Sequence, residues 1–226
     1  MSANDITDPT RRLTSLEVDE LGLEDWRILF ATLHARFRTG DFATGLALVD
    51  RIGAEAEAMN HHPDLDLSYG SVRVRLTSHD TGGVTVRDVR LARRTSEIAA
   101  ELGVTADPAG LAVLELGLDT PDAPEIKAFW AAVLGYEETE EPVELVDPLG
   151  ASPTIWFQET DDARDEPRQR WHLDLRVPPE VVEARIAAAL EAGGVLVTDE
   201  YAPRFWVLAD VQGNKVCLCT WQGRSH

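Results

Sequence analysis

The stretch AEAMNHHPDLDLSYGSVRVRLTSHD, residues 56–80, decides how the first half of the chain folds. Apolar residues alternate at positions 65, 67 and 69 and then, in shifted phase, at 72, 74 and 76, which is typical of two half-buried strands. Gly70–Ser71 at the shift indicates a turn or bulge between them. The stretch also holds His61, His62 and His79, half of the six histidines of the chain. Such a concentration points to a common role.

Helical and strand patterns surround this stretch. Residues 41–60 predict a helix whose apolar face comprises Phe42, Leu46, Val49, Ile52 and Ala56. Residues 15–22 predict a short helix, residues 26–39 a strand region, and residues 85–103 a closing helix. Thr85 and Asp88 have the spacing of a capping box at its start. The order α-β-β-α-β-β-α predicts an α+β unit with a four-stranded antiparallel sheet and helices on one face.

The pattern breaks at residues 103–109, so we expect one domain at 1–105 and a second at 106–226. Within the second, LELGLDTPDAPEIKAFWAAVLGY (residues 114–136) and HLDLRVPPEVVEARIAAALEAGG (residues 172–194) each read strand, Pro-rich turn, helix and Gly. Further strand patterns follow each of them. The sequence therefore predicts a βαβββ unit that occurs twice.

The composition excludes several classes of partner. The formal net charge is −19, of which residues 1–105 carry −5 and residues 106–226 carry −14. So acidic a surface repels phosphate backbones and anionic lipid, and we expect neither nucleic acid nor membrane as a partner. No apolar run approaches the ~20 residues of a membrane span, and the N-terminus lacks the apolar core of a signal peptide. We expect a soluble cytoplasmic protein.

The three histidines suit proton transfer, because a neutral imidazole accepts or donates a proton near neutral pH. Glu57 precedes His61 by one helical turn and could orient its ring, and Asp88 could do the same for His79. Other interpretations stay open on these residues alone. Asp88 also fits a helix cap, the adjacent histidines could form a metal site with His79 and Asp88, or they could face the helix dipole.

Residues 12–103 resemble the pterin-4a-carbinolamine dehydratases. The signature of that family is an acidic residue, His-His-Pro after three residues, an aromatic residue, a third His and an Asp. The matching positions are Glu57, His61, His62, Pro63, Tyr69, His79 and Asp88. The resemblance implies dehydration of 4a-hydroxytetrahydropterin to quinonoid dihydropterin, with the pterin as substrate, no metal or other cofactor, and a homodimer or homotetramer.

The resemblance also implies roles for these residues. His61 and His79 would transfer protons, with Glu57 and Asp88 in the same catalytic set. His62 would mainly bind the pterin. We expect Pro63, Tyr69 and Ser78 to bind substrate beside it.

Residues 110–222 resemble the glyoxalase-like domains of the vicinal oxygen chelate superfamily, whose metal-dependent members take one ligand from the first strand of each half and carboxylates from later strands. His172 stands at one such position, but its counterpart is about Ala112 and the final-strand position is Cys217. Gln158 or Glu159 could add at most one ligand. We therefore expect a metal-free domain, which could bind a second small ligand.

Trp156 and Trp206 are the expected lining of that ligand cavity. Cys217 and Cys219 are too close in sequence for an ordinary disulfide, and we expect both to be buried apolar side chains. Two alternative functions remain: a non-catalytic binding, dimerisation or regulatory protein, and a metal-dependent lyase or dioxygenase centred on the second domain.

Overall fold

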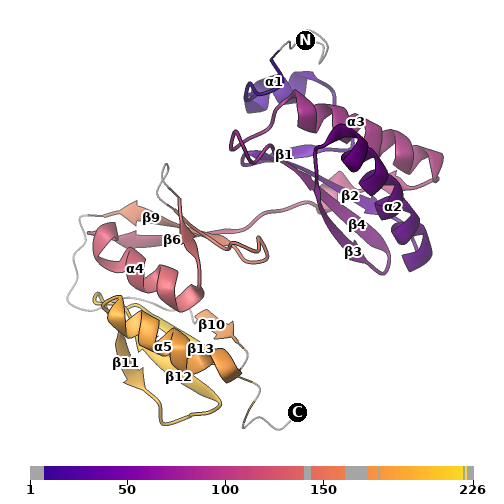
Figure 1. Cartoon of the computed structure of the whole chain (residues 1–226). Helices are drawn as coiled ribbons and strands as arrows, with labels where there is room; N and C mark the ends of the chain where they lie inside the picture. The colour runs from indigo at the N-terminus through magenta and orange to yellow at the C-terminus, as the bar shows by residue number, and fades with distance from the viewer. Residues whose placement is uncertain (1–7, 140–143, 161–172, 178, 221, 223–226) are drawn as a thin grey trace. The chain divides into compact units, whose positions relative to one another are not determined.

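The computed structural model describes residues 8–139, 144–160, 173–177, 179–220 and 222. The chain forms two compact units, Met1–Val113 and Leu114–His226 (Figure 1). Near the expected boundary after residue 105, strand β5 (Thr105–Ala106) pairs with strand β2 (Thr32–Arg38) and so belongs to the sheet of the first unit. In the described part of the chain, no helix combines the length and the apolar character that a membrane span needs.

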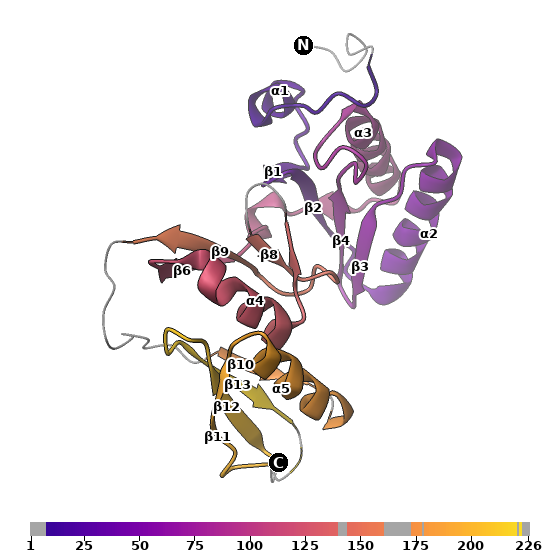
Figure 2. The same ribbon diagram turned by 60° about the vertical axis from the view of Figure 1, so that its left-hand side comes forward.

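The first unit has the expected order of elements. It runs α1 (Ser15–Glu20), β1 (Arg27–Leu29), β2, α2 (Phe42–Met59), β3 (Asp64–Ser68), β4 (Ser71–Leu76), α3 (Val86–Glu101), β5 and a short 3-10 helix (Pro108–Gly110). The sheet is antiparallel in the order β1-β2-β4-β3, with β5 added beside β2. Helices α2 and α3 lie on one face of it, as Figure 2 shows. The predicted α+β fold is confirmed.

Local signals fix where the two long helices begin and end. Asp41 precedes α2, and its side chain accepts a hydrogen bond from the backbone N–H of Thr44 at 2.8 Å. Asn60 ends α2 in the left-handed conformation, with φ of 47°. Helix α3 starts with the predicted capping box of Thr85 and Asp88, which satisfies backbone N–H groups that no helical carbonyl can reach.

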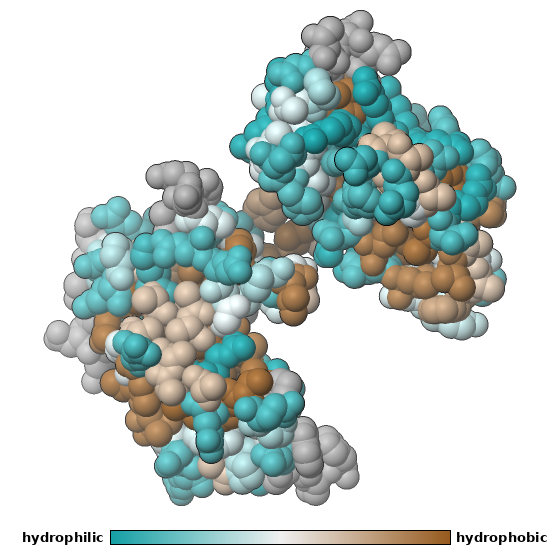
Figure 3. Space-filling view, viewed as in Figure 1, coloured by the Kyte–Doolittle hydropathy of each residue, from teal (hydrophilic) through white to brown (hydrophobic). Residues whose placement is uncertain are grey.

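The buried face of α2 differs from the predicted one. It comprises Gly45, Leu48, Ile52 and Ala56. Phe42 and Leu46 were expected on that face but stay 49% and 53% exposed, and Figure 3 shows apolar surface over this end of α2. Gly45 faces the sheet and lies so close to strand β3 that a Cβ atom there would be only 2.6 Å from Cδ1 of Leu67. A residue without a side chain lets helix and strand approach closely.

The second unit consists of two βαβββ repeats, as predicted. The first repeat is β6 (Glu115–Thr120), α4 (Ala123–Leu134), β7 (Glu137–Glu138), β8 (Glu144–Val146) and β9 (Thr154–Glu159). The second is β10 (Leu173–Arg176), a 3-10 helix (Pro179–Val181), α5 (Val182–Glu191), β11 (Val195–Thr198), β12 (Phe205–Ala209) and β13 (Lys215–Cys219). Their sheets have the matching orders β6-β9-β8-β7 and β10-β13-β12-β11.

One hydrophobic core joins the two repeats. Phe129 and Trp130 of α4 are buried in it, and the indole N–H of Trp130 donates a hydrogen bond to the carboxylate of Asp210 at 3.0 Å. Gly194 lies against Phe129, where a Cβ atom would be 2.2 Å from the ring. The two repeats therefore pack as one unit, and each leaves one face of its sheet outside the core.

Leu48→Ala should lower the free energy of local unfolding of α2 by about 2–5 kcal/mol, because it removes a side chain that is 0% exposed and leaves a cavity. Leu46→Ala is the matched control, since its side chain is 53% exposed and the change should stay under about 0.5 kcal/mol. Hydrogen exchange of the α2 amides in the full chain measures both values. Equal losses at the two positions would contradict the buried face assigned to α2.

Candidate active site of the first unit

The adjacent histidines lie just beyond the end of α2 and point to different surroundings. The left-handed Asn60 turns the chain, and the backbone N–H of His61 closes the helix by donating to the carbonyl of Ala56 at 3.0 Å. His61 is only 8% exposed, whereas the side chain of His62 is 56% exposed. Successive residues of extended chain point to opposite sides, so one imidazole turns inward and the other faces solvent.

The inward histidine contacts a carboxylate that is fully buried. Asp88 is 0% exposed, and its Oδ1 lies 2.7 Å from Nε2 of His61. Its Oδ2 accepts hydrogen bonds from the hydroxyl of Ser78 and from the backbone N–H of Thr85, each at 2.7 Å. Burial raises the pKa of Asp88, but the hydrogen bonds from His61, Ser78 and Thr85 together hold it below the ordinary value. Asp88 is therefore ionised at neutral pH.

This pairing fixes the tautomer of His61. An ionised carboxylate only accepts hydrogen bonds, so Nε2 of His61 carries the hydrogen that it shares with Asp88. In the neutral ring Nδ1 is then unprotonated and can accept a proton, and in the charged ring Nδ1 can donate one.

The partners of the two carboxylates differ from the predicted ones. Glu57 was expected to orient His61, but its carboxylate lies 3.1 Å from Nε2 of the exposed His62. Asp88 was expected to orient His79, but it binds His61. The left-handed turn at Asn60 explains the exchange, since it carries His61 off the helix face that Glu57 occupies.

His79 lies in the turn that follows β4. The turn is closed at its base by Ser78 and Gly83, where the N–H of Ser78 donates to the carbonyl of Gly83 at 3.0 Å. His79 and its neighbour Asp80 are exposed. The pKa of Asp80 is lowered chiefly by the hydrogen bond from Arg87 and in smaller part by the charge of His61. Ser78, at the base of this turn, donates to the carboxylate of Asp88 that also binds His61, so the turn that carries His79 begins beside the His61–Asp88 pair.

Asp80 and Arg87 are site neighbours that the sequence did not single out. The guanidinium of Arg87 binds both carboxylate oxygens of Asp80, at 2.6 and 3.1 Å. The only signal in the sequence was position, because Asp80 follows the third histidine and Arg87 precedes the aspartate of the signature. Seven residues and a turn separate the two, so no local spacing rule pairs them.

The predicted substrate-binding residues are only partly brought together. Pro63 is half-buried directly after His62. Ser78 is 1% exposed, and its hydroxyl is held by Asp88 and by the hydroxyl of Thr85 at 2.8 Å, so it serves the buried network. Tyr69 is 76% exposed, in the turn between β3 and β4.

That turn lies at the opposite end of the hairpin from the histidines. The neighbouring Gly70 accepts hydrogen bonds from Thr39 and Gly40, which precede α2, whereas His61 follows α2. A helix of 18 residues separates these ends by roughly 27 Å. Within one chain, Tyr69 does not share a site with His61.

A helix-covered antiparallel sheet with a His–Asp pair at a helix end and a third histidine in a nearby turn defines a small α+β domain of the pterin dehydratase class. Residues 11–98 match the family model described as pterin 4 alpha carbinolamine dehydratase. A relative from Aquifex aeolicus (strain VF5), named "Putative pterin-4-alpha-carbinolamine dehydratase", is 39% identical over 94 residues, which are 41% of this chain and 95% of the relative. The chain belongs to the pterin-4a-carbinolamine dehydratase family.

Two further similar proteins come from other organisms. A relative of the same name from Metallosphaera sedula is 37% identical over 89 residues, which are 38% of this chain and 93% of the relative. A solved structure titled as a transcriptional coactivator/pterin dehydratase from Brucella melitensis is 31% identical and covers 39% of this chain and 99% of its own, with a TM-score of 0.38.

The second unit matches a different family. Residues 115–219 match the model of a glyoxalase-like domain. A solved glyoxalase/bleomycin resistance protein/dioxygenase family enzyme from Burkholderia phytofirmans PsJN is 19% identical and covers 47% of this chain and 95% of its own, with a TM-score of 0.39. The chain thus carries a dehydratase-family unit and a glyoxalase-like unit in one polypeptide.

Strand pairing aligns the two repeats of the second unit. In the first repeat Leu116 lies beside Ile155, and in the second Leu173 lies beside Val216. All four side chains pack in or against the core. Leu116 therefore corresponds to Leu173, and Ile155 corresponds to Val216.

This alignment corrects the expected metal-ligand positions. The residue that corresponds to His172 is Glu115, which precedes Leu116, and not Ala112; His172 itself lies outside the described residues. The residue that corresponds to Cys217 is Trp156, which cannot bind a metal ion. Gln158 and Glu159 thus do not occupy the last-strand ligand position.

The two tryptophans expected in the cavity lie on different faces. Trp156 is 37% exposed, and its indole lies over Gly117, where a Cβ atom would be 2.9 Å from the ring. Trp206 pairs with the fully buried Leu218 and packs against the core. Only Trp156 is on the sheet face that a ligand can reach.

The chemistry of Cys217 does not fit a metal centre. Burial, the charge of Asp174 and a hydrogen bond with Asp174 raise the pKa of Cys217 to about 11, so the thiol keeps its proton at neutral pH. A metal ligand must be the thiolate. Among the residues that the structure describes, no group of three or more His, Cys, Asp or Glu could hold a metal ion. The described donors do not fit a divalent cation.

Asp88→Asn should destabilise the first unit by roughly 1–3 kcal/mol at pH 7, because the amide cannot replace the buried acceptor for His61, Ser78 and Thr85. The folded-state pKa of Asp88 is lowered, so its contribution is complete above its ordinary value of 3.8 and is lost as the pH falls through the folded pKa. The difference between wild type and variant should therefore shrink in acid.

Hydrogen exchange of α3 amides between pH 3 and pH 7, corrected for intrinsic exchange rates, measures this difference. Asp50→Asn is the control, because Asp50 is exposed on α2 and its change should stay under about 0.5 kcal/mol. A destabilisation by Asp88→Asn that is the same at both ends of the pH range would show that its charge does not stabilise the fold.

Proposed function

We propose that the first unit dehydrates 4a-hydroxytetrahydropterin to quinonoid dihydropterin by histidine acid–base catalysis, and so acts in tetrahydropterin recycling. Membership of the dehydratase family supports the reaction class. The observation that carries the proposal is the buried pair of His61 and Asp88, because it holds one imidazole in a defined tautomer with the other nitrogen available for a proton.

The reaction needs one base and one acid. The base removes the proton from N5 of the pterin, and the electron pair left behind forms the C4a=N5 double bond. The C4a–O bond breaks, and the acid protonates the departing hydroxyl, which leaves as water. His61 and His79 are the two groups for these transfers, since a neutral imidazole can accept the N5 proton and a protonated imidazole can donate a proton to the hydroxyl.

His62 and Glu57 suit substrate binding better than proton transfer. Their contact is exposed, with side chains that are 56% and 80% accessible, so it gives His62 a preferred orientation without removing it from solvent. An imidazole at the surface beside His61 can donate hydrogen bonds to the pterin ring or stack on it.

For the second unit we propose a small-ligand domain that works without a metal ion. Trp156 supports this, because its indole lies over Gly117 of β6, is 37% exposed and could stack with a planar ligand. The raised pKa of Cys217 disfavours the thiolate that zinc would need as a ligand at the last strand.

His61→Ala and His79→Ala should each lower kcat for this dehydration by roughly 10²–10⁴-fold, the range for loss of a general acid or base. His62→Ala should mainly raise KM. Stopped-flow mixing of the full chain with freshly generated 4a-hydroxytetrahydropterin measures these values. In each single variant the remaining histidine could take over both proton transfers, which the double variant His61→Ala/His79→Ala prevents. Full activity of the double variant would leave only a non-catalytic role for the unit.

The protein purified without chelator should carry less than stoichiometric zinc, iron or manganese, measured by elemental analysis. The strongest rival set is Glu115 with His172, to which Cys217 would have to add a thiolate that its raised pKa disfavours. About one metal ion per chain, lost on His172→Ala and retained in the control His226→Ala, would revive the metal-dependent lyase or dioxygenase.

A further inference from the structure

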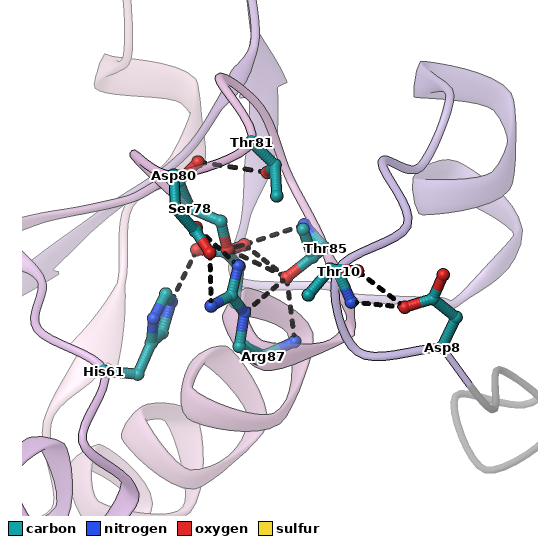
Figure 4. A network of polar contacts seen from close by, with 9 residues as sticks. Asp8, Thr10, His61, Ser78, Asp80, Thr81, Thr85 and Arg87 are labelled. Carbon is teal, nitrogen blue, oxygen red and sulfur yellow. Dashed lines mark hydrogen bonds and ion pairs between the residues drawn. The ribbon is translucent and has the colours of Figure 1, made fainter.

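Helix α3 reaches the catalytic histidines through two adjacent residues of its first turn. Asp88 points inward and binds His61 at 2.7 Å, while Arg87 points to the turn after β4 and binds Asp80 (Figure 4). Neighbouring residues on a helix are about 100° apart, so they address different segments. The two arms therefore tie the segments that carry His61 and His79 to one rigid element.

The turn itself is held by its backbone only at the base. The carbonyl of Ser78 accepts hydrogen bonds from the N–H groups of Thr81 and Gly82, at 3.0 and 2.9 Å, and from the hydroxyl of Thr81 at 3.1 Å. These bonds close the loop but do not attach its outer part to another element. Two side chains attach the turn to α3, one on each side of His79: Ser78 at the base, through Asp88 and Thr85, and Asp80 in the outer part, through Arg87.

The geometry of this ion pair restricts direction. Two nitrogens of Arg87 meet the two oxygens of Asp80, and Nε of Arg87 lies 3.4 Å from the hydroxyl of the cap residue Thr85. A planar guanidinium and a planar carboxylate that meet at two points fix each other's orientation. The Asp80 side chain is 58% exposed, so the pair adds little to stability. What it restricts is the position of the turn.

We propose that Asp80 and Arg87 are positioning residues of the dehydration site, which hold His79 at a fixed place relative to His61. This inference rests on the proposed function of the first unit. Proton transfers at N5 and at the 4a-hydroxyl require both imidazoles at set distances from one pterin. If the Asp80–Arg87 pair were broken, the outer part of the turn would still carry the His79 imidazole, but would place it correctly for only part of the time.

Asp80→Asn and Arg87→Met in the full chain should each lower kcat by about 10–100-fold with little change in KM, as expected for a misplaced catalytic group. Asp80→Glu keeps the carboxylate and should recover most of the activity. Arg51→Gln is the control, since it breaks the exposed ion pair of Arg51 with Glu101, which joins α2 and α3 away from the turn. It should leave kcat unchanged.

A double-mutant cycle shows whether the effect passes through His79. In the His79→Ala background, Asp80→Asn should cause no further loss, because there is no imidazole left to place, whereas in the His61→Ala background its effect should persist. A wild-type chain without dehydratase activity would refute the proposed function itself. An active chain in which His79→Ala lowers kcat while Asp80→Asn does not, or in which Asp80→Asn acts equally without His79, would overturn only the positioning inference.

Discussion

The first unit depends on one buried carboxylate. Asp88 has no solvent contact, so all of its hydrogen-bonding capacity must be met inside the protein. Helix α3 meets part of it through the backbone of Thr85, the end of β4 through the hydroxyl of Ser78, and the segment after α2 through His61. One side chain thus caps a helix, joins three segments and fixes the tautomer of His61. Removal of this carboxylate would therefore affect both the stability of the unit and the orientation of the His61 ring.

The two adjacent histidines enter different surroundings after one backbone turn. Asn60 adopts the left-handed conformation, and the two side chains that follow it diverge, one buried and one exposed. His61 enters the unit and pairs with a carboxylate that keeps its charge, while His62 stays at the surface with Glu57, whose charge water screens. The two rings therefore differ in burial and in hydrogen-bond partner, although they are adjacent in the sequence.

Prediction from the sequence succeeded where a few neighbouring residues determine the outcome. The cap formed by Thr85 with Asp88 and the turn at Gly70 depend on contacts within a few positions, and both were predicted correctly. The doubled βαβββ pattern was also predicted, because each strand and helix has its own local periodicity. Side-chain partners across segments could not be predicted this way. The left-handed angle at Asn60 decides which carboxylate meets which histidine, and no spacing rule expresses it.

The same limit explains the remaining differences. The apolar periodicity predicted that Phe42 and Leu46 are buried. In the structure Gly45 packs closely on Leu67, so the helix face that carries Gly45 is buried and both Phe42 and Leu46 are exposed. In the second unit, repeat spacing pointed to Ala112, whereas strand register selects Glu115. The strand register is set by which apolar side chains are buried in the core, and it thereby determines which side chains lie on the solvent-facing side of the sheet. Trp156 and Cys217 occupy corresponding positions there, so two copies of one fold offer a ligand two chemically different surfaces.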